Sequence, residues 1–169
     1  MIFVTVGTQL PFDRLVTAVD RWAGHAQPVS HVFAQIGPTD LRPSHIEWRD
    51  FIEPPECQRR MREADVIVAH AGMGTILSAL ELGKPLVVMP RRAALGEHRN
   101  EHQLATARWL AESGGVSVAF DERELAHKLD AADRIDGGTR ISQYAGDDFI
   151  RALRAFIQGD PARVPRLAA

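Results

Sequence analysis

Two glycines, Gly72 and Gly74, stand between a buried-strand pattern and a helical pattern. Because glycine has no Cβ, an anion can approach the backbone of such a loop closely, and the free N–H groups at a helix start favour negative charge. The loop can therefore hold the phosphates of a nucleotide, although a glycine pair by itself is weak support. Leu77 stands where the dinucleotide fingerprint needs its third glycine, and no Walker A lysine follows.

Two further polar loops also follow strand patterns. Gly7 and Thr8 form either a plain tight turn or a contact to a phosphate or sugar hydroxyl. The segment 96–103 offers donors and acceptors suited to hydroxyl groups, or it is a solvated helix start. His98 and His102 could share one helix face and bind a metal, but the residues between them do not form the zinc-protease motif. We expect a site without a metal.

The composition is that of an ordinary globular chain. Its 169 residues are long enough for one domain with its own core. A net charge of −2 gives no sign of a nucleic-acid-binding surface, so no nucleic-acid partner is expected. The single cysteine, Cys57, excludes an internal disulfide and fits a reducing compartment. We expect no signal peptide, because residues 1–6 lack a basic segment, and no membrane span.

Strand and helix patterns alternate along the chain. The alternation predicts an α/β fold, a Rossmann-like doubly wound and largely parallel sheet of six strands with helices on both faces. In such sheets ligands bind beyond the carboxyl ends of the strands, where the three polar loops should meet. Thr75 and Gly83 are expected to cap the third helix. The predicted strands cover 2–6, 31–36, 47–52, 65–69, 86–89 and 116–120, and the predicted helices cover about 12–23, 56–64, 75–82, 101–113 and 122–131.

The C-terminal part is predicted to be separate from this domain, which would span residues 1–133. Residues 134–141 have no helical period and contain paired glycines, which indicates a linker. A helix is expected over 142–158, followed by a tail over 159–169. Its apolar residues form one stripe, which packs either on the protein's own sheet or on another subunit.

Several motifs together resemble those of one enzyme group. They are Val6-Gly7-Thr8, the segment 70–75, Gly83-Lys84-Pro85, Pro90-Arg91 and the segment 96–103. In this order they resemble the C-terminal, donor-binding half of MurG-type (family 28) GT-B glycosyltransferases over residues 1–130. The chain is similar to bacterial exopolysaccharide subunits of the PssE type. These are related to the catalytic subunit of the eukaryotic two-subunit UDP-GlcNAc transferase.

The resemblance implies a UDP-sugar as the substrate and no cofactor. It also implies roles for individual residues, of which Ser78 departs from the pattern, since many relatives have a ribose-binding Glu there. The diphosphate would be bound by Gly7, Thr8, Gly72, Met73, Gly74, Thr75 and Arg91, the uracil and ribose by Ile52 and Ser78, and the sugar by Glu97, Asn100, Glu101, His102 and Gln103.

A GT-B active site lies between two such domains, and this chain supplies one of them. The resemblance therefore implies a membrane-anchored partner subunit that binds a lipid-linked saccharide acceptor and carries the general base. The predicted reaction is metal-independent, inverting sugar transfer in exopolysaccharide synthesis, by a cytoplasmic chain recruited to the inner face of the membrane. The alternative is a non-enzymatic UDP-sugar-binding module that regulates or scaffolds another transferase. The identity of the donor sugar is not decided by the sequence. Arg91, Arg92 and Arg99 could bind the carboxylate of a glucuronate donor, the diphosphate or an acidic surface of the partner.

Overall fold

The computed structural model describes residues 1–26, 31–135, 137, 140–142 and 144–159. Within them, six parallel strands form one sheet in the order β3-β2-β1-β4-β5-β6, which confirms the predicted fold class. The strand order reverses between β1 and β4, and this is where open α/β sheets form a binding crevice. The strands are β1 (Ile2–Thr5), β2 (Val32–Gln35), β3 (Glu47–Arg49), β4 (Val66–His70), β5 (Leu86–Met89) and β6 (Ser117–Val118).

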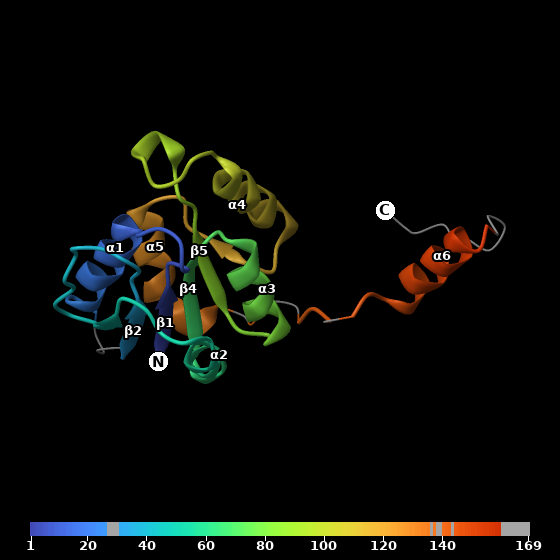
Figure 1. Ribbon diagram of the computed structural model, residues 1–169. Helices are drawn as coiled ribbons and strands as arrows, with labels where there is room; N and C mark the ends of the chain where they lie inside the picture. The colour runs from blue at the N-terminus through green and yellow to red at the C-terminus, as the bar shows by residue number, and fades with distance from the viewer. Residues whose placement is uncertain (27–30, 136, 138–139, 143, 160–169) are drawn as a thin grey trace.

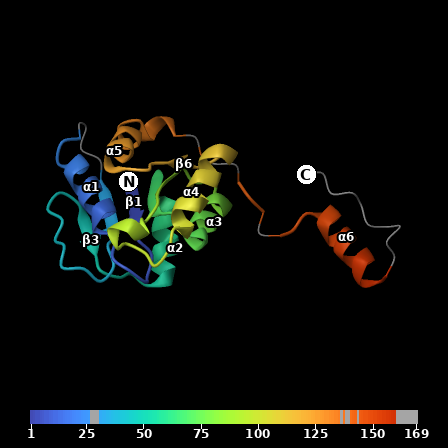
Figure 2. The ribbon, with the colours of Figure 1, turned by 90° about the horizontal axis from the view of Figure 1, so that it is seen from above.

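Helices cover both faces of the sheet (Figures 1 and 2). Alternate residues of a strand point to opposite faces. Val4 of β1 therefore joins the core under the first pair of helices, and Phe3 joins the core under the other three. The first pair is α1 (Asp13–Ala23) and α5 (Glu122–Asp130), and the other three are α2 (Pro54–Glu63), α3 (Met73–Glu81) and α4 (His102–Ser113).

Several element ends differ from the predicted ones. Helix α3 starts at Met73 with Gly72 as its N-cap, so Thr75 lies within the first turn and the prediction that it caps the helix is wrong. Gly83, with a φ of +65°, follows the helix end as expected. The third strand stops at Arg49 instead of residue 52, ahead of the proline that begins α2, and β6 has two residues instead of five.

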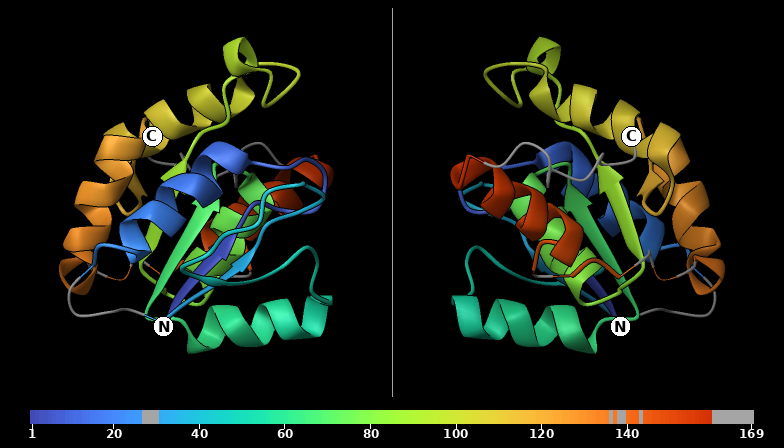
Figure 3. Two further views of the ribbon diagram at one scale, coloured as in Figure 1. Left: turned by 90° about the vertical axis from the view of Figure 1, so that its left-hand side faces the viewer. Right: turned by 90° about the vertical axis from the view of Figure 1, so that its right-hand side faces the viewer.

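The segment between β5 and α4 projects beyond the carboxyl ends of the strands (Figure 3). It contains a 3₁₀ turn, Ala93–Leu95, which ends at Gly96 with a φ of +71°. This left-handed residue reverses the chain, so the residues before and after it run in different directions. The segment carries most of the residues that were expected to bind a sugar.

Helix α6 (Asp147–Ile157) stands apart from the domain in Figures 1 and 2, and it begins five residues later than predicted. The structure therefore does not show it packed on the protein's own sheet. The end of the linker is fastened to α3, because Arg140 Nε donates to the Glu81 carbonyl at 2.9 Å. The predicted tail beyond residue 159 and linker residues 136, 138 and 139 lie outside the described residues. Among the described helices, none has the length and apolar character needed to cross a membrane.

Candidate functional site

The carboxyl edge of the sheet holds two adjoining hollows with a common wall. The polar hollow, about 410 Å³, lies among the loops after β1, β4 and β5 and the start of α4. The apolar hollow, about 250 Å³, lies between the loop after β1 and helices α2 and α3. Gly7, Thr8, Gly74 and Thr75 line both. The three polar loops therefore meet as the sequence predicted.

His70, the last residue of β4, stands in the polar hollow between two glycines. A Cβ at Gly7 would lie 2.8 Å from His70 Cε1, and a Cβ at Gly72 would lie 2.2 Å from His70 Nε2. The imidazole thus fills the space that a side chain at either position would take. Burial, reinforced by the charge of Arg91, lowers the pKa of His70 from 6.5 to about 4, so the ring is neutral at pH 7.

The first turn of α3 forms the common wall together with Gly7 and Thr8 of the loop after β1. Its N-cap residue, Gly72, has no side chain to accept hydrogen bonds from the N–H groups that a helix start leaves unpaired. Gly72, Gly74 and Thr75 line the polar hollow, whereas Met73 is 46% exposed and lines neither hollow. The wall therefore combines close backbone approach with free donors, the combination expected of an anion site.

The two residues predicted to bind uracil and ribose both line the apolar hollow. Ile52 is buried there, and Ser78 faces it from α3 while its Oγ donates to the Gly74 carbonyl at 2.9 Å. Phe51 and Cys57 complete the apolar lining, and burial raises the pKa of the Cys57 thiol. The chain brings these residues together from a loop and two helices, and their contacts to uracil and ribose remain a prediction.

Arg91 lines the polar hollow, but its guanidinium is engaged with the protein. Its Nη2 donates to the carbonyls of Val6 at 2.8 Å and Leu10 at 2.6 Å, and its Nη1 donates to the Pro11 carbonyl. The side chain is buried, and this burial lowers its pKa to about 10, so it remains charged at pH 7. Arg91 thus binds the loop after β1, and its predicted contact to the diphosphate remains a prediction.

Of the five residues predicted to bind the sugar, Gln103 alone is among those that line the polar hollow. Its Oε1 accepts a hydrogen bond from the Arg91 N–H at 3.2 Å, which leaves its amide N–H₂ group for a ligand. Asn100 and His102 are exposed, and the Asn100 side chain accepts from the His102 N–H at 3.2 Å. His98, a member of the polar segment 96–103 that is not among the five, also lines the polar hollow.

The two acidic residues of the same segment face elsewhere. Glu97 is paired with Arg14 of α1. Glu101 lines a different hollow with Arg92 and Arg108, and its Oε1 accepts from the Ala94 N–H at 3.3 Å. In this structure neither carboxylate reaches the polar hollow. Both carboxylates are held by other groups of the protein: Glu97 accepts from Arg14 and from the Arg92 N–H, and Glu101 accepts from the Ala94 N–H.

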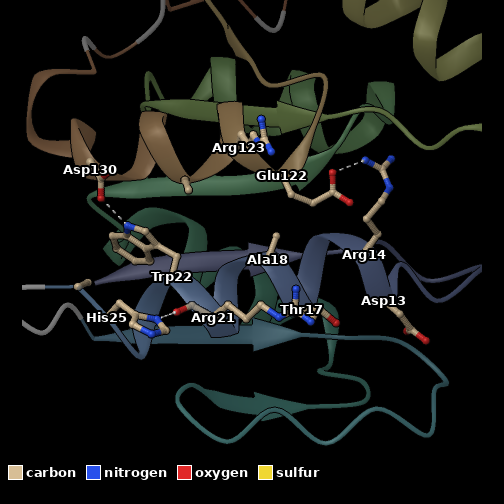
Figure 4. A pocket seen from close by; sticks show the side chains of 12 residues that line it. Asp13, Arg14, Thr17, Ala18, Arg21, Trp22, His25, Glu122, Arg123 and Asp130 are labelled. Carbon is tan, nitrogen blue, oxygen red and sulfur yellow. Dashed lines mark hydrogen bonds and ion pairs between the residues drawn. The ribbon is translucent and has the colours of Figure 1, made fainter.

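A larger hollow, about 620 Å³, lies elsewhere, between α1 and α5 (Figure 4). Two of its polar side chains are engaged with other lining residues: Trp22 Nε1 donates to Asp130 at 2.8 Å, and His25 Nδ1 contacts the Arg21 carbonyl at 2.7 Å. None of its described lining residues is a glycine, and at the start of α5 the N-cap Asp121 already accepts from the Arg123 and Glu124 N–H groups. We therefore place the candidate site at the carboxyl edge, where the smaller hollows are.

Comparison with protein families shows which family the chain belongs to. Residues 1–134 match the family described as "Glycosyltransferase family 28 C-terminal domain". The chain belongs to this family. The matched range covers the whole sheet with its five helices and both hollows, and it ends before α6.

Curated relatives of this family 28 domain include two kinds of protein. The chain is 31% identical over 123 residues, 66% of its length, to "UDP-N-acetylglucosamine transferase subunit ALG13" from Mus musculus. It is 30% identical over 144 residues, 81% of its length, to "UDP-N-acetylglucosamine--N-acetylmuramyl-(pentapeptide) pyrophosphoryl-undecaprenol N-acetylglucosamine transferase" from Phenylobacterium zucineum. The matches span 10% and 33% of those proteins, so the family 28 domain corresponds to a part of each.

Solved structures show the same fold. The family 28 domain is similar to an NMR structure of ALG13, with a TM-score of 0.60 and 21% identity over 84% of this chain and 90% of that one. It is also similar to the crystal structure of Acinetobacter baumannii MurG, with a TM-score of 0.62 and 19% identity over 93% of this chain and 49% of that one. At these identities the likeness shows the fold, which is that of GT-B glycosyltransferase C-terminal domains.

Proposed function

We propose that this family 28 domain binds the UDP-sugar donor of a metal-independent, inverting glycosyltransferase. The observation that carries the proposal is the pair of adjoining hollows whose common wall is the start of α3. A UDP-sugar consists of a nucleoside with a flat uracil base, a diphosphate and a polar sugar, joined in that order. The apolar hollow with Ile52 and Ser78 suits the nucleoside, the wall from Gly72 to Thr75 suits the diphosphate, and the polar hollow with Gln103 suits the sugar.

The same wall suits the chemistry of the departing diphosphate. Transfer breaks the bond between the anomeric carbon and the diphosphate and leaves negative charge on UDP. The N–H groups at the start of α3 and one N–H of the neutral His70 ring can stabilise this charge without a divalent cation. A low pKa suits His70 to this role, because the uncharged ring can be held against two backbone segments at low desolvation cost.

The acceptor hydroxyl needs a general base on the opposite face of the sugar. Among the described residues that line the polar hollow there is no carboxylate, and a pKa of about 4 makes His70 a weak base at neutral pH. The other lining histidine, His98, has its Nδ1 atom engaged with Asn100 at 3.1 Å. These observations support a base supplied by a second protein. The relative named as a subunit, ALG13, supports the same division.

The second protein in this proposal is a membrane-anchored subunit that binds a lipid-linked saccharide. Helix α6 is the contact proposed for it, because Phe149, Leu153, Phe156 and Ile157 are 44–75% exposed on a helix that stands apart from the domain. Such a contact would recruit the chain to the inner face of the cytoplasmic membrane. We assign the complex to exopolysaccharide synthesis, as in the PssE-type subunits that the sequence resembles.

A non-enzymatic UDP-sugar-binding module is the second candidate. One observation favours it: Glu97 and Glu101, which a transferase could use on the sugar, do not line the polar hollow. The two candidates agree on donor binding and differ on transfer. Binding and transfer are therefore measured separately.

Calorimetric titration of the full chain in EDTA tests donor binding. We expect UDP to bind about tenfold or more tightly than UMP, since the second phosphate reaches the N–H groups of the wall. UDP-glucose, UDP-glucuronate and UDP-GlcNAc in the same titration identify the sugar. Binding that requires Mg²⁺, or no preference for UDP over UMP, would contradict the proposed wall.

Transfer is tested with membranes from cells that lack this chain, which supply the lipid-linked acceptor and the partner. Label in the sugar of the UDP-sugar should enter the lipid fraction only when membranes and chain are combined. The regulatory module predicts instead that the membranes alone transfer the labelled sugar, at a rate that the added chain changes. Full-rate transfer to extracted lipid by the chain alone would refute the need for a partner.

A further inference from the structure

A partly buried ion pair ties the segment after β5 to helix α1. Arg14 Nε and Nη2 donate to the two carboxylate oxygens of Glu97 at 2.6 and 2.9 Å. The two side chains are 13% and 12% exposed, although the residues are 83 positions apart. Bidentate, charge-assisted bonds that are shielded from water are among the stronger polar contacts in proteins. This pair is therefore a firm tertiary connection.

Both partners make further contacts that involve the same segment. Glu97 Oε2 accepts from the Arg92 N–H at 2.8 Å, and Arg14 Nη2 donates to the Pro90 carbonyl at 2.9 Å. Arg14 also lies 3.8 Å from Glu122 at the start of α5. The Arg92–Glu97 hydrogen bond thus links the two ends of the turn from Pro90 to Glu97, and Arg14 attaches this turn to helix α1. Both carboxylate oxygens of Glu97 are occupied, so the carboxylate would have to leave these partners to bind a sugar.

The fastened turn carries the groups that bound the sugar end of the polar hollow. Arg91 lies inside it, and the Arg91 N–H holds the Oε1 atom of Gln103 at 3.2 Å. The same residue binds the loop after β1 through the carbonyls of Val6 and Leu10. A connected series of contacts thus runs from Arg14 through Glu97 and the turn to Gln103. The residues of the apolar hollow do not take part in this series.

We infer that Arg14 and Glu97 are positioning residues for the sugar end of the donor site. This inference rests on the proposed function, and it replaces the direct sugar contact that the sequence suggested for Glu97. The ion pair holds the turn in place, and the turn holds the amide of Gln103 toward the sugar. Loss of the ion pair therefore weakens binding of the sugar and leaves binding of the nucleoside unchanged.

Hydrogen exchange of the full chain without ligand tests the fastening. In Glu97→Gln and Arg14→Ala, amides in 91–103 should exchange about tenfold faster than in the unmodified chain, because the turn opens more often. The matched control is Glu63→Gln, which breaks the exposed Arg59–Glu63 pair on α2 and should leave this segment unchanged. Unchanged exchange in the Glu97 and Arg14 variants would overturn the inference.

Titration with UDP and with the UDP-sugar that binds most tightly tests the positioning role. Both single variants should lose about fivefold or more in UDP-sugar affinity and less than about twofold in UDP affinity. The double variant Arg14→Ala/Glu97→Ala separates positioning from stability, since it leaves no unpaired buried charge and should be more stable than either single variant. Its UDP-sugar affinity should stay low; recovery together with stability would overturn the inference.

The two proposals fail in different ways. If the unmodified chain binds neither UDP nor any UDP-sugar, the proposed function is wrong, and the exchange comparison still decides whether the pair fastens the turn. If the unmodified chain binds UDP-sugar and the Glu97 variant loses UDP and UDP-sugar affinity equally, the function stands and the positioning role is wrong.

Discussion

Gly72 and Gly74 look alike in the sequence, but an added methyl group should have opposite effects at the two positions. A Cβ at Gly72 would lie 2.2 Å from Nε2 and 2.8 Å from Cδ2 of His70, while a Cβ at Gly74 meets nothing within 4 Å. We therefore predict that Gly72→Ala destabilises the protein and that Gly74→Ala does not. The pair forms a matched test, because both residues lie at the start of α3.

The magnitude follows from how little the histidine ring can move. Gly7 closes its other side, since a Cβ there would already lie 2.8 Å from Cε1. Overpacking in such a closed space costs about 1–3 kcal/mol, and we expect the upper end for Gly72→Ala. Gly74→Ala lies in the first helical turn, where alanine is favoured over glycine by up to about 1 kcal/mol. The two variants should therefore differ by about 3 kcal/mol in the free energy of unfolding.

Urea unfolding of the two variants at pH 7 measures this difference. The double variant His70→Ala/Gly72→Ala then assigns the cause, because removal of the ring removes the clash. A double-mutant cycle with the single variants His70→Ala and Gly72→Ala should give a favourable coupling energy of about 1 kcal/mol or more. Equal stability of Gly72→Ala and Gly74→Ala, or no coupling with His70, would refute the packing argument. Titration with UDP adds a second contrast, since the new methyl at Gly74 enters both hollows and should weaken binding in a stable protein.

Three further predictions concern the histidine, the sugar contact and the last helix. The pKa of His70 is about 4 in the folded protein and about 6.5 in the unfolded chain. Between pH 4 and 6.5 the unfolded chain therefore binds a proton that the folded protein does not. The contribution of His70 to the free energy of unfolding is fully present above pH 6.5 and falls by about 3 kcal/mol as the pH drops toward 4. His70→Gln should remove this contribution to the pH dependence of the free energy of unfolding, measured by urea unfolding at several pH values. Gln103→Ala should abolish transfer while UDP affinity changes less than about twofold, and equal loss of both would contradict a contact to the sugar. Deletion of residues 142–169 should leave UDP affinity unchanged and abolish recovery of the chain with membranes in a flotation assay; retained flotation would exclude α6 as the contact.

The fold and the glycine wall could be predicted because their signals are local. Strands alternate with helices, each run of apolar residues is bounded by turn residues, and parallel connections leave few possible topologies. The loops after β1, β4 and β5 then had to meet at one edge of the sheet. Ile52 and Ser78, which come from different elements, lie in one hollow for the same reason.

The roles of single polar side chains could not be predicted in the same way. Glu97 was expected at the sugar because it belongs to a run of polar residues, yet its partner is Arg14, 83 positions away. Sequence spacing does not reveal such a pairing, and the reversal at Gly96 is visible only in the backbone angles. The sequence does carry a signal for His70, because this residue ends a buried strand and directly precedes the glycine loop.

Arg91 shows how a residue can shape the site through the backbone. A buried guanidinium needs acceptors for its N–H groups, and here the carbonyls of Val6, Leu10 and Pro11 supply them. The loop after β1 must therefore turn these carbonyls toward Arg91, and its residues Gly7 and Thr8 remain as the lining of both hollows. The hydrogen bonds to these three carbonyls stabilise the buried positive charge of Arg91 when the site is empty. The charged side chain still lines the polar hollow, together with the start of α3 and the neutral His70 ring, and its contact to the diphosphate stays a prediction.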